Sequence, residues 1–340
     1  MTVHVDSIGE IGRISEQLQR SRSLAGSGEI GTARVATLNL IVHLDDAERF
    51  EWVVDRAMRV AAKHPSRLVI LDATGRTTGV DVSTQTRQAS SETVVSERVD
   101  VGCADLDAAT IKSVTQEISV HDMPTVLWWT GATFAKNETF TTLAELATTV
   151  LVDSSGSRSD EETIRELAGF LALHPALVLR DLAFMRLAPW QDMIAQFFDD
   201  PALREDLFSI TGVDVESGSD AEALYLVGWL GSRLSWEACA PDTFCTREGR
   251  RVPVRMTVRG ERRRVASVTL HSVDSVYRAE LSDDDENVVR LSVGGAKAKP
   301  SWLVPLQNID NASLIERVIL EAPHDSIFST SLEAVRALLT

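Results

Sequence analysis

The fold is decided by three consecutive runs, RVATLNLIV (34–42), FEWVVDRAMRVAAK (50–63) and LVILD (68–72). In the first run, apolar residues occur both at even and at odd positions, so both faces of the expected strand carry them. This is typical of a strand that is covered on both faces. In the second run the apolar residues recur at helical spacing, and His64-Pro65 ends the helix. The third run predicts another strand. Together they predict a βαβ unit with parallel strands and a right-handed crossover.

The alternation of strands and helices continues beyond this unit. Further strands are expected at residues 93–99, 125–130 and 150–153, with helices at residues 106–118 and 140–148. Such alternation is typical of α/β layers, so we predict a Rossmann-like domain with a mainly parallel sheet over residues 31–154. In residues 1–30 we expect a short helix at residues 11–21 and then a flexible loop that leads into this domain.

The composition changes abruptly at SSGSRSDEE (154–162), where small and charged residues replace the apolar pattern. We predict a linker at residues 155–162 and a second domain at residues 163–340. Helices are expected there at residues 163–172, 190–198, 221–234, 312–320 and 331–339. Between them RVPVRMTV, RVASVTLHSV, SVYRAELS and NVVRLSV alternate at period two, which predicts an antiparallel meander. The second domain is therefore expected to be α+β with an antiparallel sheet.

The charge balance limits the classes of partner. The chain has 34 Lys and Arg against 50 Asp and Glu, a formal net charge of -16. Binding to nucleic acid or to anionic lipid depends on basic side chains that neutralise phosphates, so we expect neither as a partner. The sequence contains no apolar run of about 20 residues and no secretory signal pattern, and a cytoplasmic location is expected.

The sequence offers little for nucleotide or metal chemistry. A literal GxGxxG occurs at Gly26-Ser-Gly28-Glu-Ile-Gly31, but it precedes a strand, whereas dinucleotide-binding proteins place it between a strand and a helix. The turn after the first expected strand, His43-Leu-Asp-Asp-Ala, has two carboxylates and no glycine to admit a phosphate. The seven histidines have no ligand-like spacing, and GxxxxGK[ST], HExxH and GxSxG are absent. We therefore predict no catalytic residue, no metal site and no cofactor.

Two residue types remain as candidates for function. Cys239 and Cys245 lie close together in the sequence, and they are either a redox pair or two ordinary free thiols. The chain has seven tryptophans against two tyrosines, and tryptophan is enriched both in interface hot spots and in protein cores. Both interpretations are open for the tryptophans that lie near Pro and Arg residues, which are Trp128-Trp129, Trp190, Trp229 and Trp236.

Four stretches taken in order suggest a family. They are RVATLNLIV (34–42) with HPSRLVI (64–70), MPTVLWWTG (123–131), RDLAFMRLAPW (180–190) running into AQFFD (195–199), and GWLGSRLSW (228–236). Their order and spacing resemble the OpcA family of bacterial glucose-6-phosphate dehydrogenase assembly proteins, over most of the chain from about residue 31 onward.

The resemblance implies a non-catalytic protein that binds glucose-6-phosphate dehydrogenase, promotes its active form as an allosteric activator, and so raises NADPH production in the oxidative pentose phosphate pathway. The alternative is a nucleotide- or sugar-phosphate-binding enzyme or sensing module, suggested by the Rossmann-like architecture alone. As partner-binding residues we expect Trp128, Trp129, Arg186, Pro189, Trp190, Arg233 and Trp236, with Cys239 and Cys245 as the redox candidates.

Overall fold

The computed structural model describes residues 36–89, 92–156, 160–259, 264–307, 309–320 and 326–340. The chain divides into two compact units. Unit 1 takes in the residues up to Val152 together with His174–Leu179 and Asn311–Pro323, and unit 2 takes in Asp153–Leu173, Arg180–Asp310 and His324–Thr340. The helix expected at residues 11–21 and the GxGxxG at residues 26–31 lie outside the described residues.

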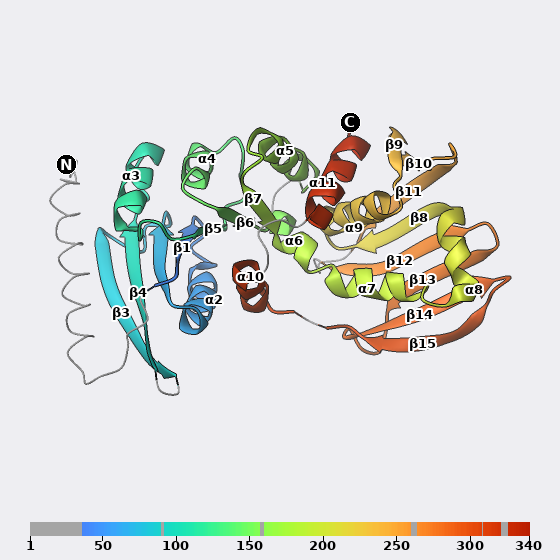
Figure 1. Cartoon of the computed structure of the whole chain (residues 1–340), viewed down its shortest axis with the longest axis horizontal. Coiled ribbons are helices and arrows are strands. Elements are labelled where there is room, and N and C mark those ends of the chain that lie inside the picture. Colours follow the sequence, from blue (N-terminus) through green and yellow to red (C-terminus); the bar gives the residue numbers. More distant parts are fainter. Residues whose placement is uncertain (1–35, 90–91, 157–159, 260–263, 308, 321–325) are drawn as a thin grey trace. The chain divides into compact units, whose positions relative to one another are not determined.

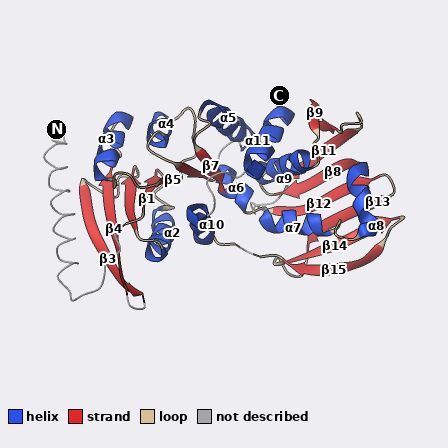
Figure 2. Cartoon of the chain, viewed as in Figure 1, coloured by secondary structure: helices blue, strands red, loops and turns tan. Residues whose placement is uncertain are grey.

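Unit 1 is built on a mainly parallel sheet, which we name sheet A (Figures 1 and 2). Its described strands have the order β3-β4-β2-β1-β5-β6-β7. Their bounds are β1 Leu38–Leu44, β2 Ser66–Asp72, β3 Val80–Ala89, β4 Glu92–Gly102, β5 Thr125–Trp129, β6 Thr149–Val152 and β7 Val178–Asp181. Strand β1 pairs in parallel with both β2 and β5, so the predicted parallel βαβ unit is confirmed.

Helices cover both faces of sheet A. The crossover helix α2 (Phe50–Lys63) packs beside α10 (Asn311–Leu320) on one face, and α3 (Ala108–Ile118) packs beside α4 (Glu138–Ala144) on the other (Figure 1). Because of this double cover, every residue of β1 and of β2 is buried. Asp107 and Asn137 cap α3 and α4 by accepting backbone N–H bonds, as short polar residues at helix starts commonly do.

Strand β3 was not expected from the sequence. It pairs antiparallel with β4 along its whole length and forms the edge of sheet A. Its sequence, VDVSTQTRQA, is mostly polar, so it lacks the apolar run that identified the buried strands. An edge strand that faces solvent does not need that run.

Unit 2 is built on a second, mixed sheet, which we name sheet B. The order of its described strands is β15-β14-β13-β12-β8-β11-β10-β9. Their bounds are β8 Ile210–Ser217, β9 Glu237–Ala240, β10 Thr243–Cys245, β11 Arg251–Val258, β12 Val265–Ser272, β13 Ser275–Leu281, β14 Val288–Gly295 and β15 Lys299–Pro305. Strands β12, β13 and β14 form three strands of the expected antiparallel meander, and β15, which the sequence analysis did not predict, extends it. The fourth expected strand, β11, does not pair with β12.

The expectation of a purely antiparallel sheet in this part of the chain is wrong at one place. Strand β8, which the sequence analysis did not predict, lies between β11 and β12. It pairs antiparallel with β12 but parallel with β11. The alternation of RVPVRMTV is real, but alternation reports which residues face the core and does not report the direction of the neighbouring strand.

Helices of unit 2 pack on sheet B and on one another. They are α5 Asp160–Leu173, α6 Leu182–Met185, α7 Ala188–Gln196, α8 Pro201–Arg204, α9 Asp220–Arg233 and α11 Ser326–Leu338, with 3-10 turns η1 Ser154–Gly156 and η2 Glu205–Ser209. Helix α9 is nearly all buried and packs closely on α11. At this crossing a Cβ on Gly228 would lie 2.4 Å from Val335 Cγ2 and 2.5 Å from the Ser331 carbonyl oxygen. Only glycine lets the two backbones approach so closely.

None of the described helices combines the length and the apolar character that crossing a bilayer requires.

Candidate functional site

The carboxyl ends of the strands in sheet A are the first place to look for a site. In doubly wound sheets, ligands bind outside these ends, at the point where the strand order reverses. Here that point lies between β1 and β5, because the chain runs from β1 to β2 on one side while β5 pairs on the other. The residues at the ends of β1, β2 and β5 therefore decide whether unit 1 can hold a nucleotide.

Two aromatic rings occupy the ends of β1 and β5. The rings of His43 and Trp129 are stacked, with centroids 4.0 Å apart and planes 12° apart. Trp129 is fully buried, and its indole N–H donates to the Thr133 carbonyl oxygen at 3.0 Å. Burial lowers the pKa of His43 to about 4, against a smaller opposing effect of the Asp72 charge, so His43 is neutral at physiological pH.

The carboxylate at the end of β2 is hydrogen-bonded by the loop that follows this strand. Asp72 is fully buried, and it accepts hydrogen bonds from the Thr74 backbone N–H (2.8 Å), the Thr74 hydroxyl (2.6 Å) and the Thr77 backbone N–H (2.6 Å). These bonds outweigh the effect of burial and lower the Asp72 pKa. Dinucleotide-binding folds use an acidic residue in this part of the fold to bind a ribose hydroxyl. In this chain that role would require the loop bonds to break.

The turn after β1 brings a carboxylate close to the end of β5. A Cβ at Gly131, just after β5, would lie 2.7 Å from Asp45 Oδ2 and 2.9 Å from Trp129 Nε1, so side chains already fill the space beside it. Burial raises the pKa of Asp45, and neighbouring Asp46 adds to the effect. A phosphate placed here would meet carboxylates in place of the free backbone N–H groups that bind anions.

The four predicted tryptophans lie in the cores of their units. The exposed fractions are 1% for Trp128, 0% for Trp129, 4% for Trp190 and 8% for Trp236. Trp128 and Trp129 point to opposite faces of β5, and both are buried because helices cover both faces of sheet A. This burial gives all four side chains a packing role within their own unit, and their part in binding a partner stays a prediction.

Arg186 and Pro189 are also engaged within unit 2. Pro189 sits in the first turn of α7, where a missing backbone N–H costs no helical hydrogen bond. Arg186 Nη1 and Nη2 donate to the two carboxylate oxygens of Asp153 at 3.1 and 2.8 Å, and Arg186 Nε donates to Glu222 Oε1 at 3.1 Å. The ion pairs give Arg186 a structural role, and the helix start gives Pro189 one.

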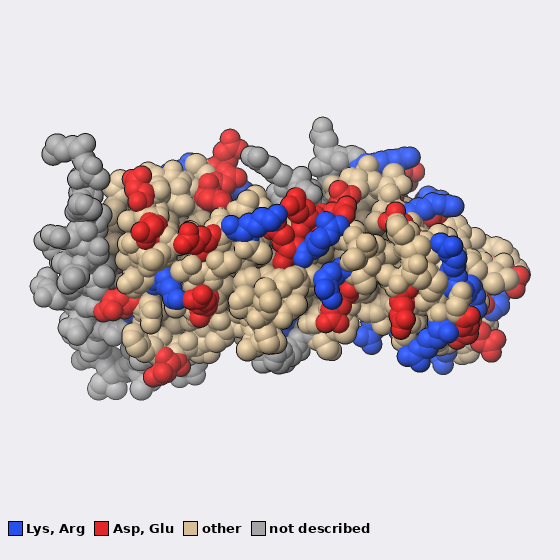
Figure 3. Space-filling view, turned by 90° about the horizontal axis from the view of Figure 1, so that it is seen from above, with Lys and Arg blue, Asp and Glu red and all other residues tan. Residues whose placement is uncertain are grey.

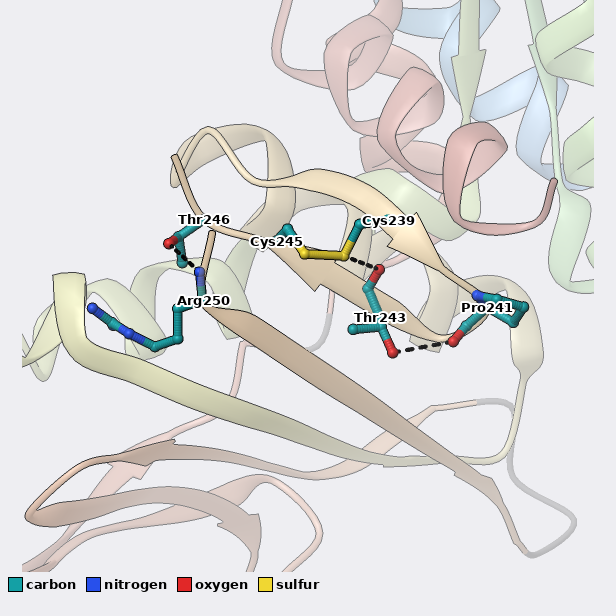
Figure 4. The surroundings of a disulfide bond; sticks show 6 residues. All are labelled: Cys239, Pro241, Thr243, Cys245, Thr246 and Arg250. Atoms are coloured by element: carbon teal, nitrogen blue, oxygen red, sulfur yellow. Dashed lines mark hydrogen bonds between the residues drawn. A yellow bond between two sulfur atoms is a disulfide. The ribbon is translucent and has the colours of Figure 1, made fainter. Parts of the chain in front are cut away.

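Arg233 and the cysteine pair are at the surface. Arg233 is the last residue of α9 and is exposed. Cys239 and Cys245 form a disulfide that joins β9 to β10, with Cα atoms 5.8 Å apart (Figure 4). In the same hairpin the Thr243 hydroxyl donates to the Pro241 carbonyl oxygen at 3.1 Å. Of the two alternatives that the sequence left open, the structure contains the paired form.

The third cysteine is of a different kind. Cys103 is buried, and burial raises the pKa of its thiol to about 12, with the Asp72 charge adding to the effect. A thiol that stays protonated at physiological pH is a poor nucleophile. We therefore expect Cys103 to be inert.

Sequence reasoning missed the polar residues that surround Arg186. Asp153, Asp181, Glu222 and Tyr225 meet with it in one cluster. The only signal in the sequence is that Asp153 and Asp181 each follow a short apolar run. That pattern is common at strand ends and says nothing about which ends meet.

Two family profiles match the chain. The one described as the glucose-6-phosphate dehydrogenase subunit N-terminal domain matches residues 57–169, and the one described as the C-terminal domain of that subunit matches residues 178–332. Both carry the family name OpcA.

Curated relatives match over part of their length. A protein of Nostoc punctiforme named "Putative OxPP cycle protein OpcA" is 30% identical over 189 residues, which is 53% of this chain and 40% of that protein. A protein of Synechocystis sp. with the same name is 34% identical over 128 residues, 37% of this chain and 26% of that protein. The matches thus span less than half the length of these relatives.

Among solved structures, the fold is similar to KijD10, a 3-ketoreductase from Actinomadura kijaniata in complex with TDP-benzene and NADP, in its open conformation. The TM-score is 0.51 at 12% sequence identity, over 89% of this chain and 95% of that chain. A second KijD10 structure, of a mutant in complex with the same two ligands, gives a TM-score of 0.50 at 10% identity over the same shares of the two chains. At these identities the likeness concerns the fold alone.

Proposed function

The chain belongs to the OpcA family of glucose-6-phosphate dehydrogenase subunits, and from that membership we propose that it is a non-catalytic assembly factor and allosteric activator of glucose-6-phosphate dehydrogenase. The observation that carries the proposal is the pair of family profiles, which between them match both folded units. The partner is glucose-6-phosphate dehydrogenase, and the pathway is the oxidative pentose phosphate pathway.

The side chains at the carboxyl ends of β1, β2 and β5 in unit 1 support a role without catalysis. A reductase of similar fold needs its nucleotide at the switch point, and in this chain the stack of His43 on Trp129 and the saturated Asp72 stand there. Side chains at the switch point do not hinder an assembly factor, because such a factor acts through its surface. We infer that unit 1 retains the architecture of a nucleotide-binding domain and serves as a scaffold.

An activator of this kind needs only differential binding. If it binds the active form of the dehydrogenase more tightly than the inactive form, it shifts the equilibrium by that difference. Coupling free energies of about 1 to 3 kcal/mol are typical and correspond to roughly 5- to 150-fold changes in affinity. No reacting side chain is required.

The surface of unit 2 around Arg233 is the best remaining candidate for the contact. Arg233 ends α9, the half-buried Trp229 lies one turn earlier on the same side, and the exposed Cys239 follows in the hairpin. Arginine and tryptophan are the residue types that most often dominate interface energetics. The disulfide of this hairpin has one exposed cysteine and is open to reductants, so we propose redox control at this hairpin as part of the same function.

Other classes of partner fit less well. On the face shown in Figure 3, basic and acidic side chains are interspersed, and the chain carries a net charge of -16. Nucleic acids and anionic membranes would be repelled by such a chain. We therefore expect a protein partner, and a complex that forms faster at low ionic strength if the dehydrogenase presents a basic surface.

The proposal is tested by titrating this protein into glucose-6-phosphate dehydrogenase from the same cell. The apparent KM for glucose 6-phosphate and the mass of the complex are followed together. We expect a saturable fall in KM, of roughly 5-fold or more, at the same concentration at which the two proteins co-migrate. No change in KM, kcat or mass at micromolar concentrations would remove the proposal.

Two matched variants then locate the surface. Arg233→Glu reverses a charge at the end of α9, whereas Arg290→Glu makes the same change at an exposed position on β14. We expect Arg233→Glu to weaken the complex at least tenfold and Arg290→Glu to leave it unchanged. Equal affinities for the two variants would move the contact away from α9.

The alternative of a nucleotide-binding enzyme or sensing module has its own readout. Isothermal titration of NADP, NADPH and glucose 6-phosphate into this protein alone would detect a ligand. We expect no binding at millimolar concentration, because binding at the switch point would require the buried His43–Trp129 stack to open.

A further inference from the structure

Unit 2 holds a cluster of buried charged side chains at the two places where the chain leaves sheet A. Asp153 directly follows β6, and Asp181 is the last residue of β7, the strand next to β6. The Ser154 backbone N–H donates to Asp181 Oδ1 at 3.2 Å, so the two exit segments are joined to each other. Asp181 also caps α6 by accepting the Ala183 backbone N–H at 2.9 Å.

Helix α9 is tied to both exit segments through this cluster. Arg186, which ends α6, donates to both oxygens of Asp153 and to Ser155 Oγ (2.7 Å), and its Nε donates to Glu222 in the first turn of α9. One turn further along α9, the Tyr225 hydroxyl donates to Asp181 Oδ2 at 2.8 Å. The cluster therefore joins α9 to the segments that follow β6 and β7.

Three carboxylates of the cluster lie close together. They belong to Asp153, Asp181 and Glu222, and the charge of Asp153 raises the pKa of the other two. Asp181 is 0% exposed and Glu222 is 3% exposed, so water does little to screen them. Buried carboxylates this close together cannot all remain ionised without a large cost, and the usual outcome is that one of them keeps a proton.

Glu222 is the carboxylate best placed to lose and regain that proton near neutral pH. Three groups act on it: Arg186 from the end of α6, Asp153 from the segment after β6, and the backbone N–H of Val265 at the start of β12. Burial raises its pKa to about 7, since the effects of Arg186 and Val265 only partly oppose burial and the Asp153 charge. Asp181 titrates lower, because burial and Asp153 raise its pKa to about 6.

We propose that this cluster is a proton-dependent clamp, which holds the two exit segments against α9 while Glu222 is protonated and loosens them when that proton passes to solvent. With Glu222 neutral, Arg186 keeps its two bonds to Asp153, and the cluster carries one negative charge less. With Glu222 ionised, two carboxylates share one guanidinium and repel each other across it. The inference does not depend on the identity of the partner.

Hydrogen exchange of the full-length protein, followed by mass spectrometry at pH 6 and pH 8, tests the clamp. Exchange times are corrected for the intrinsic effect of pH on amide exchange. Peptides covering residues 149–156, 180–187 and 220–226 should lose protection by about tenfold between the two pH values, since the protonated fraction of a group with a pKa of about 7 falls about tenfold over that interval. Wild-type protein with equal protection at both pH values would overturn the proposal.

Variants assign the effect to the cluster. Glu222→Gln keeps a neutral side chain at every pH, so its protection should differ by less than about twofold between pH 6 and pH 8. The control Glu280→Gln changes a glutamate of β13 that pairs with Arg278 at the surface, and it should keep the wild-type response. A Glu222→Gln variant that keeps the tenfold response would refute the assignment.

Should Glu222→Gln fail to fold, Asp153→Asn gives a second answer. Removing the Asp153 charge removes one of the two effects that raise the Glu222 pKa. The midpoint of the exchange response should then move to lower pH. A midpoint that stays near 7 in Asp153→Asn would count against the clamp as firmly as an unchanged response in Glu222→Gln.

Discussion

Replacing Trp129 by alanine separates a core role from an interface role for the tryptophan pair. Trp129 is fully buried, stacks on His43 and meets Phe140 edge to face with ring centroids 5.3 Å apart. Removing such a ring leaves a cavity, and buried Trp→Ala changes cost about 3 to 5 kcal/mol. For a unit of this size that corresponds to a fall in Tm of roughly 6 to 20 °C.

The assay is thermal and urea unfolding of the variant, compared with Leu303→Ala as a control at an exposed position of β15. The control should change the free energy of unfolding by less than about 0.5 kcal/mol. If Trp129→Ala lost less than about 1 kcal/mol of stability yet bound glucose-6-phosphate dehydrogenase more weakly, Trp129 would be a surface anchor and the reasoning from burial would be refuted.

Four further predictions concern unit 2. Tyr225→Phe removes the hydroxyl that donates to buried Asp181, and urea unfolding at pH 7 should show a loss of about 1 to 3 kcal/mol, whereas a neutral effect would mean that water replaces the hydroxyl. The Asp181 pKa is raised from 3.8 to about 6, so the folded state keeps this proton to higher pH than the unfolded state does. The free energy of unfolding should therefore fall by roughly 3 kcal/mol as the pH rises from about 4 to 6. Urea midpoints that rise over this interval would contradict this sign. Gly228→Ala places a methyl group against α11, and urea unfolding should show a loss of about 1 to 3 kcal/mol in stability. The control Gly169→Ala on α5 should show no such loss, because a Cβ there meets nothing within 4 Å. Reducing the Cys239–Cys245 disulfide with dithiothreitol opens a small loop and should lower the free energy of unfolding by about 2 kcal/mol. The check is the Tm with and without the reductant. The Tm of a Cys239→Ser, Cys245→Ser double variant should not respond to the reductant.

The elements that the sequence predicted well are those in which one physical signal is sufficient. The run LNLIVHL is buried along its whole length in β1, and the helical spacing of FEWVVDRAMRVAAK sets the buried stripe of α2. The elements it missed lack that signal. Strand β3 is polar at the edge of sheet A, and β8 carries a glycine and two acidic residues among its valines.

The candidate site shows the same limit more sharply. Sequence enrichment in tryptophan was correct as an observation, but enrichment cannot separate a core side chain from an interface anchor, because both depend on the same large apolar ring. The cluster around Arg186 combines residues 181 of β7 and 222 and 225 of α9 with residues 153 and 186, which follow β6 and α6. No local pattern connects positions so far apart in the chain.

The sequence by itself determined the parallel βαβ core, the change from alternating strands and helices to consecutive strands, and the family. These depend on local periodicity and on the order of short motifs. Only the tertiary structure decided that both tryptophans of β5 face inward, that β11 and β8 run parallel, and that three carboxylates meet one arginine in unit 2. The physical reason is that burial, strand direction and the pKa of a carboxylate depend on neighbours that the chain brings together only when it folds.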